Sequence, residues 1–255
     1  PDLDIAAAKE QLNLSSDQFE FLDAILNHYA VMPHEKLVYL THKEKPWNWY
    51  DPKCVRTDNW GYLHLETHKN PIKIDKHKPQ YGVGLVSSVK DFGYGIFEIE
   101  AKLPTGNRLW PAFWMWSPLS NSWPPEIDVF EGYTDNRNGY LKFNRFNPLG
   151  WWNLPSNIWT HKNNGKAVNL KARTGYSGFK NPATNFIKYT CTWTKEYILI
   201  EHDNKVVRMV DNPEVLKHFN DKKMCVVINN HFQKDPPKGD NYSDFVIKYF
   251  KYVPL

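Results

Sequence analysis

The stretch Trp123-Pro124-Pro125-Glu126-Ile127-Asp128-Val129-Phe130-Glu131-Gly132-Tyr133 places three acids within six positions, between aromatic and proline residues. Successive side chains of a strand alternate between its two faces, so Glu126 and Asp128 share one face while the apolar residues between them point into a core. Strict alternation would put Glu131 on the wrong face. One extra residue in a β-bulge at 129–130 would return it, and bulges are common beside active sites. We therefore interpret this stretch as a catalytic strand.

The spacing of the two glutamates suits a particular chemistry. With the bulge, Glu126 and Glu131 are roughly 13 Å apart at Cα, at about 3.3 Å per residue. Side chains that lean toward each other can close this gap to the roughly 5 Å carboxyl separation of retaining glycosidases. Three neighbouring carboxyl groups cannot all ionise at low cost, so their pKa values must spread and one can keep its proton near neutral pH. The alternative is an ordinary half-solvated strand, against which the aromatic and proline residues upstream argue.

Composition limits the classes of protein to consider. A chain of 255 residues can bury one sizeable core, and all-β sandwiches of this length commonly form a single domain. The net charge of +4 is too small to predict nucleic-acid binding, although it would suit a polyanionic polymer. The chain has 11 tryptophans, 14 tyrosines and 14 phenylalanines. Exposed rings in a groove are good platforms for the apolar faces of sugars, although many of these rings can simply be core.

The cysteines, the spacing of possible metal ligands and the first residue of the chain give no direct indication of function. Cys54, Cys191 and Cys225 form no CxxC pair, and the last two lie in apolar runs that predict buried thiols; at most one disulfide is possible. No side-chain cluster has the spacing of a metal site, and no stretch is apolar enough to span a membrane. Because the chain begins at Pro1 without a methionine, we expect a mature or trimmed form. We also expect a secreted, periplasmic or cell-surface protein that acts as a monomer.

The spacing of apolar residues changes near residue 34, from a helical period to short runs typical of strands. Ser15-Ser16-Asp17-Gln18 is a plausible helix capping box, and the apolar residues that follow have helical spacing as far as Pro33. We expect a helical segment at 1–34 and a β-domain at 35–255, in which short apolar runs recur about every 8 to 12 residues, as in a sandwich or jelly roll. The expected strands lie near 55–67, 82–90, 95–103, 112–116, 140–146, 186–193, 197–202, 206–210, 224–230 and 245–253, with a short surface helix at 212–219.

Three motifs in order give the chain a family resemblance. The runs Gly93-Tyr94-Gly95-Ile96-Phe97-Glu98-Ile99-Glu100-Ala101-Lys102-Leu103-Pro104, Leu109-Trp110-Pro111-Ala112-Phe113-Trp114-Met115-Trp116 and Glu126-Ile127-Asp128-Val129-Phe130-Glu131 resemble glycoside hydrolase family 16. That family includes laminarinases, lichenases, agarases, porphyranases and kappa-carrageenases. The acidic motif is similar to its bulged form, found in laminarinases and galactan hydrolases. The resemblance covers about 55–253 and implies a β-jelly-roll of two curved antiparallel sheets, with the acidic strand on the floor of a concave cleft.

The resemblance also implies a role for each acid. Glu126 would be the nucleophile, Glu131 the general acid/base, and Asp128 the residue that tunes and orients the nucleophile. Cleavage would proceed by double displacement through a covalent glycosyl-enzyme, with retention at the anomeric carbon.

Several other residues are candidates for binding sugar. Trp123 is the first choice for a stacking platform and Trp110 the second. Tyr133 is the next candidate, and His231, where the family's sheet end reaches the cleft, could bind sugar hydroxyls or be structural. Trp114 and Trp116 alternate with the residues between them, so that either they or their neighbours Phe113 and Met115 face the cleft.

Departures from the family pattern bear on substrate and metal. Many 1,3-glucan hydrolases carry histidines after the acidic strand, whereas this chain has Leu141-Lys142-Phe143-Asn144-Arg145-Phe146. Lys142 and Arg145, with Arg137, could contact the sulfates or carboxylates of an anionic polysaccharide, although a solvated charged face explains these cations equally well. Asn144 is a further candidate for binding substrate. Family members often bind calcium through an aspartate in the last strand. The nearest position here is Lys248, so we expect no calcium and no other cofactor.

The leading hypothesis is a secreted endo-acting β-glycosidase with a polysaccharide substrate and no nucleic-acid or membrane partner. An anionic red-algal galactan is slightly preferred over a 1,3-β-glucan. A carbohydrate-binding module that has lost turnover and a transglycosylase are the alternatives. The three intact acids disfavour the binding module.

Overall fold

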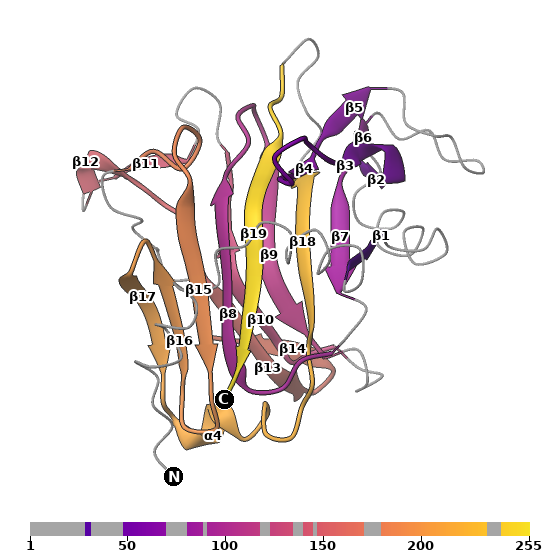
Figure 1. The fold of residues 1–255 in the computed structure, drawn as a ribbon. Coiled ribbons are helices and arrows are strands. Elements are labelled where there is room, and N and C mark those ends of the chain that lie inside the picture. Colours follow the sequence, from indigo (N-terminus) through magenta and orange to yellow (C-terminus); the bar gives the residue numbers. More distant parts are fainter. Residues whose placement is uncertain are drawn as a thin grey trace.

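The computed structural model describes residues 29–31, 48–69, 81–88, 91–117, 123–134, 140–144, 147–170, 180–233 and 241–255. Two seven-stranded antiparallel sheets pack face to face (Figure 1). Sheet I has the order β1 (Tyr29–Val31), β7 (Leu85–Ser88), β18 (Cys225–Phe232), β9 (Leu109–Trp116), β10 (Glu126–Glu131), β13 (Asn157–Asn163) and β14 (Lys166–Asn169). Sheet II has the order β17 (Lys205–Val210), β16 (Ile198–His202), β15 (Ile187–Trp193), β8 (Gly95–Lys102), β19 (Phe245–Pro254), β4 (Leu63–Leu65) and β3 (Val55–Thr57). The architecture confirms the predicted all-β sandwich.

Smaller elements flank the two sheets. Strands β2 (Asn48–Tyr50), β6 (Tyr81–Val83) and β5 (Thr67–Lys69) form a three-stranded sheet, and β11 (Leu141–Asn144) pairs with β12 (Asn147–Trp152). A 3-10 turn, η1 (Pro52–Cys54), precedes β3. The expected surface helix is α4 (Pro213–Leu216), which begins where the Asn212 side chain accepts a hydrogen bond from the backbone N–H of Glu214. The described residues contain no helix long and apolar enough to cross a membrane.

The core lies between the sheets and follows from strand alternation. On β8, Phe97, Ile99 and Ala101 are fully buried, and on β9 Phe113 and Met115 are fully buried in the same apolar cluster. Each large apolar side chain removed from water in this way contributes about 1.5–3 kcal/mol.

The same alternation on β9 settles which tryptophans leave the core. Trp114 and Trp116 are half-buried on the other face of sheet I, against a second apolar cluster that includes Cys225 and Val227. They therefore share the outer face of sheet I with the neighbouring side chains of β10.

The predicted bulge is present in β10. Asp128 lies opposite Trp114 and Phe130 lies opposite Phe113, so that Val129 is an extra residue between two consecutive partners on β9. The shift returns Glu131 to the face of Asp128, opposite Ala112. Without this insertion Glu131 would point into the core.

The N-terminal prediction differs from the structure where it can be compared. The prediction of a helix as far as Pro33 is wrong at Tyr29–Val31. These residues form strand β1, which pairs with β7. Pairing with an edge strand supplies backbone hydrogen bonds that outweigh local helical spacing. Residues 1–28 and 32–47 lie outside the described residues, so the division of the chain near residue 34 stays a prediction.

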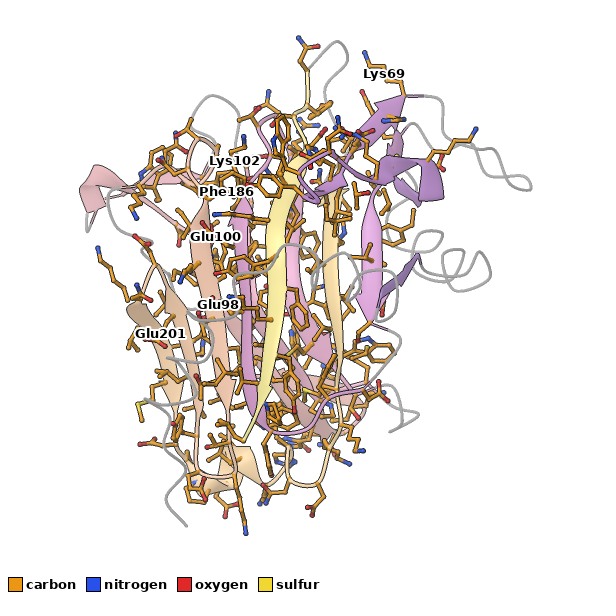
Figure 2. The ribbon with its side chains drawn as sticks, viewed as in Figure 1. Lys69, Glu98, Glu100, Lys102, Phe186 and Glu201 are labelled. Atoms are coloured by element: carbon orange, nitrogen blue, oxygen red, sulfur yellow. The ribbon has the colours of Figure 1, made fainter. Side chains whose placement is uncertain are left out.

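Sheet II presents a charged outer face, on the side of the sandwich opposite the acids of β10. Figure 2 shows Glu98, Glu100 and Lys102 in a column along β8, with Phe186 beside Lys102. The Lys248 ammonium lies 3.3 Å from a carboxylate oxygen of Glu100. Lys248, the position nearest to the calcium aspartate that the resemblance implies, is therefore a cation paired with a carboxylate. Within the described ranges, no group of three or more histidine, cysteine, aspartate or glutamate side chains is placed to hold a metal ion.

All three cysteines are buried free thiols. Burial raises the pKa of Cys54 to about 12 and also raises that of Cys191, which keeps both thiols protonated and unreactive. This confirms the buried thiols predicted for Cys191 and Cys225.

Candidate active site

The three acids of β10 lie on one face, in a setting built by its two neighbouring strands. On the β9 side, Glu126 is opposite Trp116 and Asp128 is opposite Trp114. On the β13 side, Glu126 is opposite Trp159. The carboxyl groups are thus flanked by indole rings, which exclude water and strengthen electrostatic effects between the acids.

Glu131 accepts two hydrogen bonds on the same oxygen. The Tyr133 hydroxyl donates to its Oε1 at 2.8 Å, and the Trp110 indole N–H donates to the same atom at 3.1 Å. The two donor rings lie against each other, with centroids 5.1 Å apart. Because both bonds reach Oε1, they are compatible with a proton on Oε2, as a general acid requires.

Glu126 and Asp128 form a hydrogen-bonded pair. The Trp123 indole N–H donates to Glu126 Oε2 at 2.7 Å. Burial raises the pKa of Glu126 to about 7, with the charge of Glu131 adding to the rise, whereas the hydrogen bonds from Trp123 and Asp128 oppose it. Burial and the charges of both glutamates hold the pKa of Asp128 well above its usual range. Asp128 is therefore the protonated partner, which donates to Glu126.

A hydrogen-bonded network beside Trp110 joins β9, β18 and β2. The Trp114 indole N–H donates to Asn229 Oδ1 at 2.7 Å, so the Asn229 amide nitrogen faces the His231 ring, 2.9 Å from Nδ1. An amide nitrogen only donates, so His231 Nδ1 accepts and its ring proton lies on Nε2. The Tyr50 hydroxyl lies 3.0 Å from the same Nδ1, and the His231 ring meets Trp110 edge-on with centroids 4.6 Å apart.

The structure brings together most of the predicted site residues. Trp110 and Tyr133 both donate to Glu131, and His231 contacts Trp110. Trp123 is 37% exposed and packs on Trp159 with centroids 5.0 Å apart, so one ring both contacts an acid and meets solvent. Arg137 and Arg145 lie outside the described residues, and only the backbone of Lys142 and Asn144 is described, so their suggested contacts stay predictions.

Sequence reasoning missed four residues around the acids: Tyr50, Trp114, Trp159 and Asn229. Tyr50 belongs to an aromatic loop that begins at Pro46, and the alternation along 113–116 allows Trp114 to face either the cleft or the core. Asn229 stands two positions before His231, which is the spacing for a shared strand face. Trp159 gives no local signal, because its place beside Glu126 depends on the register between β10 and β13.

Comparison with known proteins places the chain in a family. The model for glycosyl hydrolases family 16 matches residues 42–249, most of the chain. The chain belongs to glycosyl hydrolases family 16. Endo-1,3-1,4-beta-glycanase EglC of Rhizobium meliloti (strain 1021) is 28% identical over 145 residues, and Endo-1,3-1,4-beta-glycanase ExsH of the same strain is 28% identical over 144 residues. Each match covers 56% of this chain but only 27% of the relative.

Solved structures share the fold of this family 16 chain. LamAcat from Zobellia galactanivorans has a TM-score of 0.70 at 19% identity, covering 89% of this chain and 90% of its own. The laminarinase catalytic domain from Thermotoga maritima MSB8 has a TM-score of 0.68 at 18% identity, covering 90% and 92%. These similarities confirm the jelly-roll architecture implied by the sequence motifs.

The hydrogen bond from Trp123 to Glu126 leads to a prediction for this family 16 site. Trp123→Phe keeps an aromatic ring but removes the donor. Because a hydrogen bond to a charged acceptor contributes about 1.5–3 kcal/mol, we expect kcat/KM on a cleaved polysaccharide to fall about 10-fold or more. Trp123→Ala removes the ring as well and should also raise KM.

The matched control is Trp60→Phe, since Trp60 is 69% exposed in the turn between β3 and β4 of sheet II. It should leave both kinetic constants unchanged. Steady-state kinetics of the three variants separates the two contributions of Trp123. Wild-type kcat/KM in Trp123→Phe would show that the indole N–H has no part in turnover.

Proposed function

We propose that the chain is a retaining, endo-acting hydrolase of a β-linked polysaccharide. The observation that carries the proposal is the bulge at Val129, which puts Glu126, Asp128 and Glu131 on one face with different hydrogen-bond partners. Family membership supports the same class of reaction. A carbohydrate-binding module would have no need for a protonated, buried Asp128 hydrogen-bonded to Glu126.

In the first step, Glu131 acts as general acid. It gives its Oε2 proton to the glycosidic oxygen while a carboxylate oxygen of Glu126 attacks the anomeric carbon from the opposite face. The bond from carbon to the leaving oxygen breaks, and the glycosyl ester of Glu126 forms. Asp128 donates a hydrogen bond to Glu126, which keeps the carboxylate oriented and stabilises its ionised form.

In the second step, Glu131 is ionised and acts as general base. Tyr133 and Trp110 stabilise its negative charge through their bonds to Oε1. A water molecule loses a proton to Glu131 and attacks the anomeric carbon, which breaks the ester and releases Glu126. Two inversions give net retention of the β configuration.

For the substrate, we propose a β-glucan with 1,3 linkages, alone or mixed with 1,4 linkages. The two curated relatives carry names of endo-1,3-1,4-beta-glycanases, which supports this choice. The slight preference for an anionic galactan depended on Lys142, Arg145 and Arg137, whose side chains have no described contacts, and no comparison supports it. A polymer substrate also suits our expectation of a secreted or cell-surface protein.

A panel of polysaccharides tests the proposed function. Wild type and Glu126→Gln are incubated with laminarin, mixed-linkage β-glucan, agarose, porphyran and carrageenans, and released oligosaccharides are separated by size. We expect wild type alone to release internal fragments from laminarin or mixed-linkage glucan. Cleavage of a sulfated galactan alone would overturn the glucan assignment. Binding of a polymer with no release of oligosaccharides by wild type would overturn the hydrolase assignment.

A further inference from the structure

The bulge leaves one backbone carbonyl that needs a partner from outside sheet I. Val129 has no opposite residue on β9, and β13 pairs only with residues 126–128 of β10. Its carbonyl oxygen lies 3.0 Å from Nε2 of His202. His202 is the last residue of β16 in sheet II and is completely buried. The contact therefore crosses the core and joins the opposite sheet to the catalytic strand.

The chemistry of the two atoms fixes the direction of this bond. A carbonyl oxygen only accepts, so His202 donates through a proton on Nε2. Nδ1 has no hydrogen-bond partner among the described residues, and burial lowers the ring's pKa to about 4, so the ring is neutral near neutral pH. Tyr189 and Phe130 pack edge-on against the ring, at centroid distances of 5.1 and 6.3 Å, and limit its rotation.

The next strand of the same hairpin provides a second anchor. Arg208 on β17 is buried, and its guanidinium donates to Ser156 Oγ at 2.9 Å and to the Ser156 carbonyl at 2.7 Å. The preceding residue, Pro155, accepts a hydrogen bond from the backbone N–H of Glu131 at 2.8 Å. Figure 1 shows the β16–β17 hairpin at one edge of sheet II. Its two inward polar side chains thus reach the bulge and the segment bonded to Glu131.

We propose that His202 is a positioning residue for the reaction, holding the Val129 carbonyl so that the bulge keeps Asp128 and Glu131 at their working separation. The proposal rests on the proposed hydrolase function. A bulge can shift its extra residue or flatten, and either movement would turn Glu131 relative to Glu126. A displacement of about 1 Å in a catalytic group can lower the rate by roughly 10²-fold. His202 touches neither substrate nor reacting atoms, so its effect must come through the strand.

Three variants separate positioning from simple stabilisation. His202→Leu removes the donor, and His202→Gln keeps a side-chain N–H that can reach the carbonyl. Ile200→Ala damages the core two residues away on β16 but keeps the hydrogen bond from His202 to Val129. We expect His202→Leu to lower kcat by roughly 10²-fold with little change in KM, and His202→Gln to recover most of the loss. Ile200→Ala should lower the melting temperature at least as much as His202→Leu while keeping kcat near that of wild type. The proposal is wrong if kcat follows melting temperature in all three variants, or if His202→Gln is as slow as His202→Leu.

Amide hydrogen exchange measured by NMR tests the same idea without turnover. In His202→Leu, the Glu131 amide, which donates to Pro155, should exchange at least 10-fold faster than in wild type, while amides of β8 and β15 change much less. Ile200→Ala should lack this local effect. If wild type cleaves no polymer, the hydrolase proposal fails on its own, and the exchange experiment still decides whether His202 holds the bulge. Unchanged exchange at Glu131 in His202→Leu would overturn the positioning role.

Discussion

Glu126→Gln is expected to lower polysaccharide cleavage by about 10⁴-fold or more while polymer binding is retained. The substitution removes the oxygen nucleophile but keeps the size of the side chain and an acceptor for the Trp123 indole. Kinetics on the cleaved polymer, with affinity electrophoresis in a gel that contains it, measures the two effects separately.

Chemical rescue provides the control for this variant. Glu126→Ala leaves space for azide, which should restore cleavage of an aryl β-glycoside and give the α-glycosyl azide, since only one inversion then occurs. Rescue that gives the β-azide would place the nucleophile elsewhere.

Glu126→Gln should also change the free energy of unfolding, by an amount that depends on pH. The pKa of Glu126 is about 7 in the fold against an ordinary value of 4.5, so folding takes up a proton between these values. The contribution of Glu126 to the free energy of unfolding is therefore largest at low pH and is lost as the pH rises from about 4.5 to about 7. Above pH 7 the ionised carboxylate costs on the order of 3 kcal/mol. Glu126→Gln should melt about 5–10 °C above wild type at pH 8 and close to it at pH 4.5, as measured by calorimetry. A lower melting temperature for Glu126→Gln than for wild type at pH 8 would contradict the conclusion that the ionised Glu126 carboxylate destabilises the fold.

Glu131→Gln should have the second largest effect, and it should depend on the leaving group. Loss of the general acid is expected to lower cleavage of the polymer by about 10²–10⁴-fold. An aryl glycoside with a good leaving group needs no proton, so formation of the glycosyl-enzyme should be nearly normal and its hydrolysis slow. Pre-steady-state kinetics should show a burst of released phenol followed by slow turnover.

Azide distinguishes Glu131 from Glu126. It attacks the accumulated glycosyl-enzyme without base assistance, so Glu131→Gln should give the β-glycosyl azide. Equal loss on the polymer and on the activated glycoside would argue against a role in proton transfer.

Local pattern in the sequence was sufficient to predict the bulged strand that carries the three acids. Glu131 is an odd number of residues from Glu126 and Asp128, so it can share their strand face only if the strand contains one extra residue. That extra residue is Val129. This prediction succeeded because face alternation is a local geometric rule that the buried apolar residues enforce. Trp110 and Tyr133 were expected to bind sugar, whereas the hydrogen bonds that both donate to Glu131 were not predicted.

The supports behind and beside that strand could not be predicted in the same way. His202 and Arg208 contact residues 73 and 52 positions away in sequence, and these contacts depend on how sheet II packs on sheet I. Tyr50 reaches His231 across 181 residues. Tyr29–Val31 has helical spacing in the sequence yet pairs with β7, because an edge strand offers unpaired backbone groups. Long-range pairing of this kind leaves no periodic trace in the sequence.

The stereochemistry of cleavage tests the central claim most directly. Wild type is added to the polymer identified by the panel, and ¹H NMR follows the anomeric proton of the new reducing ends before mutarotation. If Glu126 and Glu131 act by double displacement, the β-anomer appears first and the α-anomer grows in slowly. Initial appearance of the α-anomer would mean inversion by a single displacement, and it would contradict the assignment of Glu126 as nucleophile.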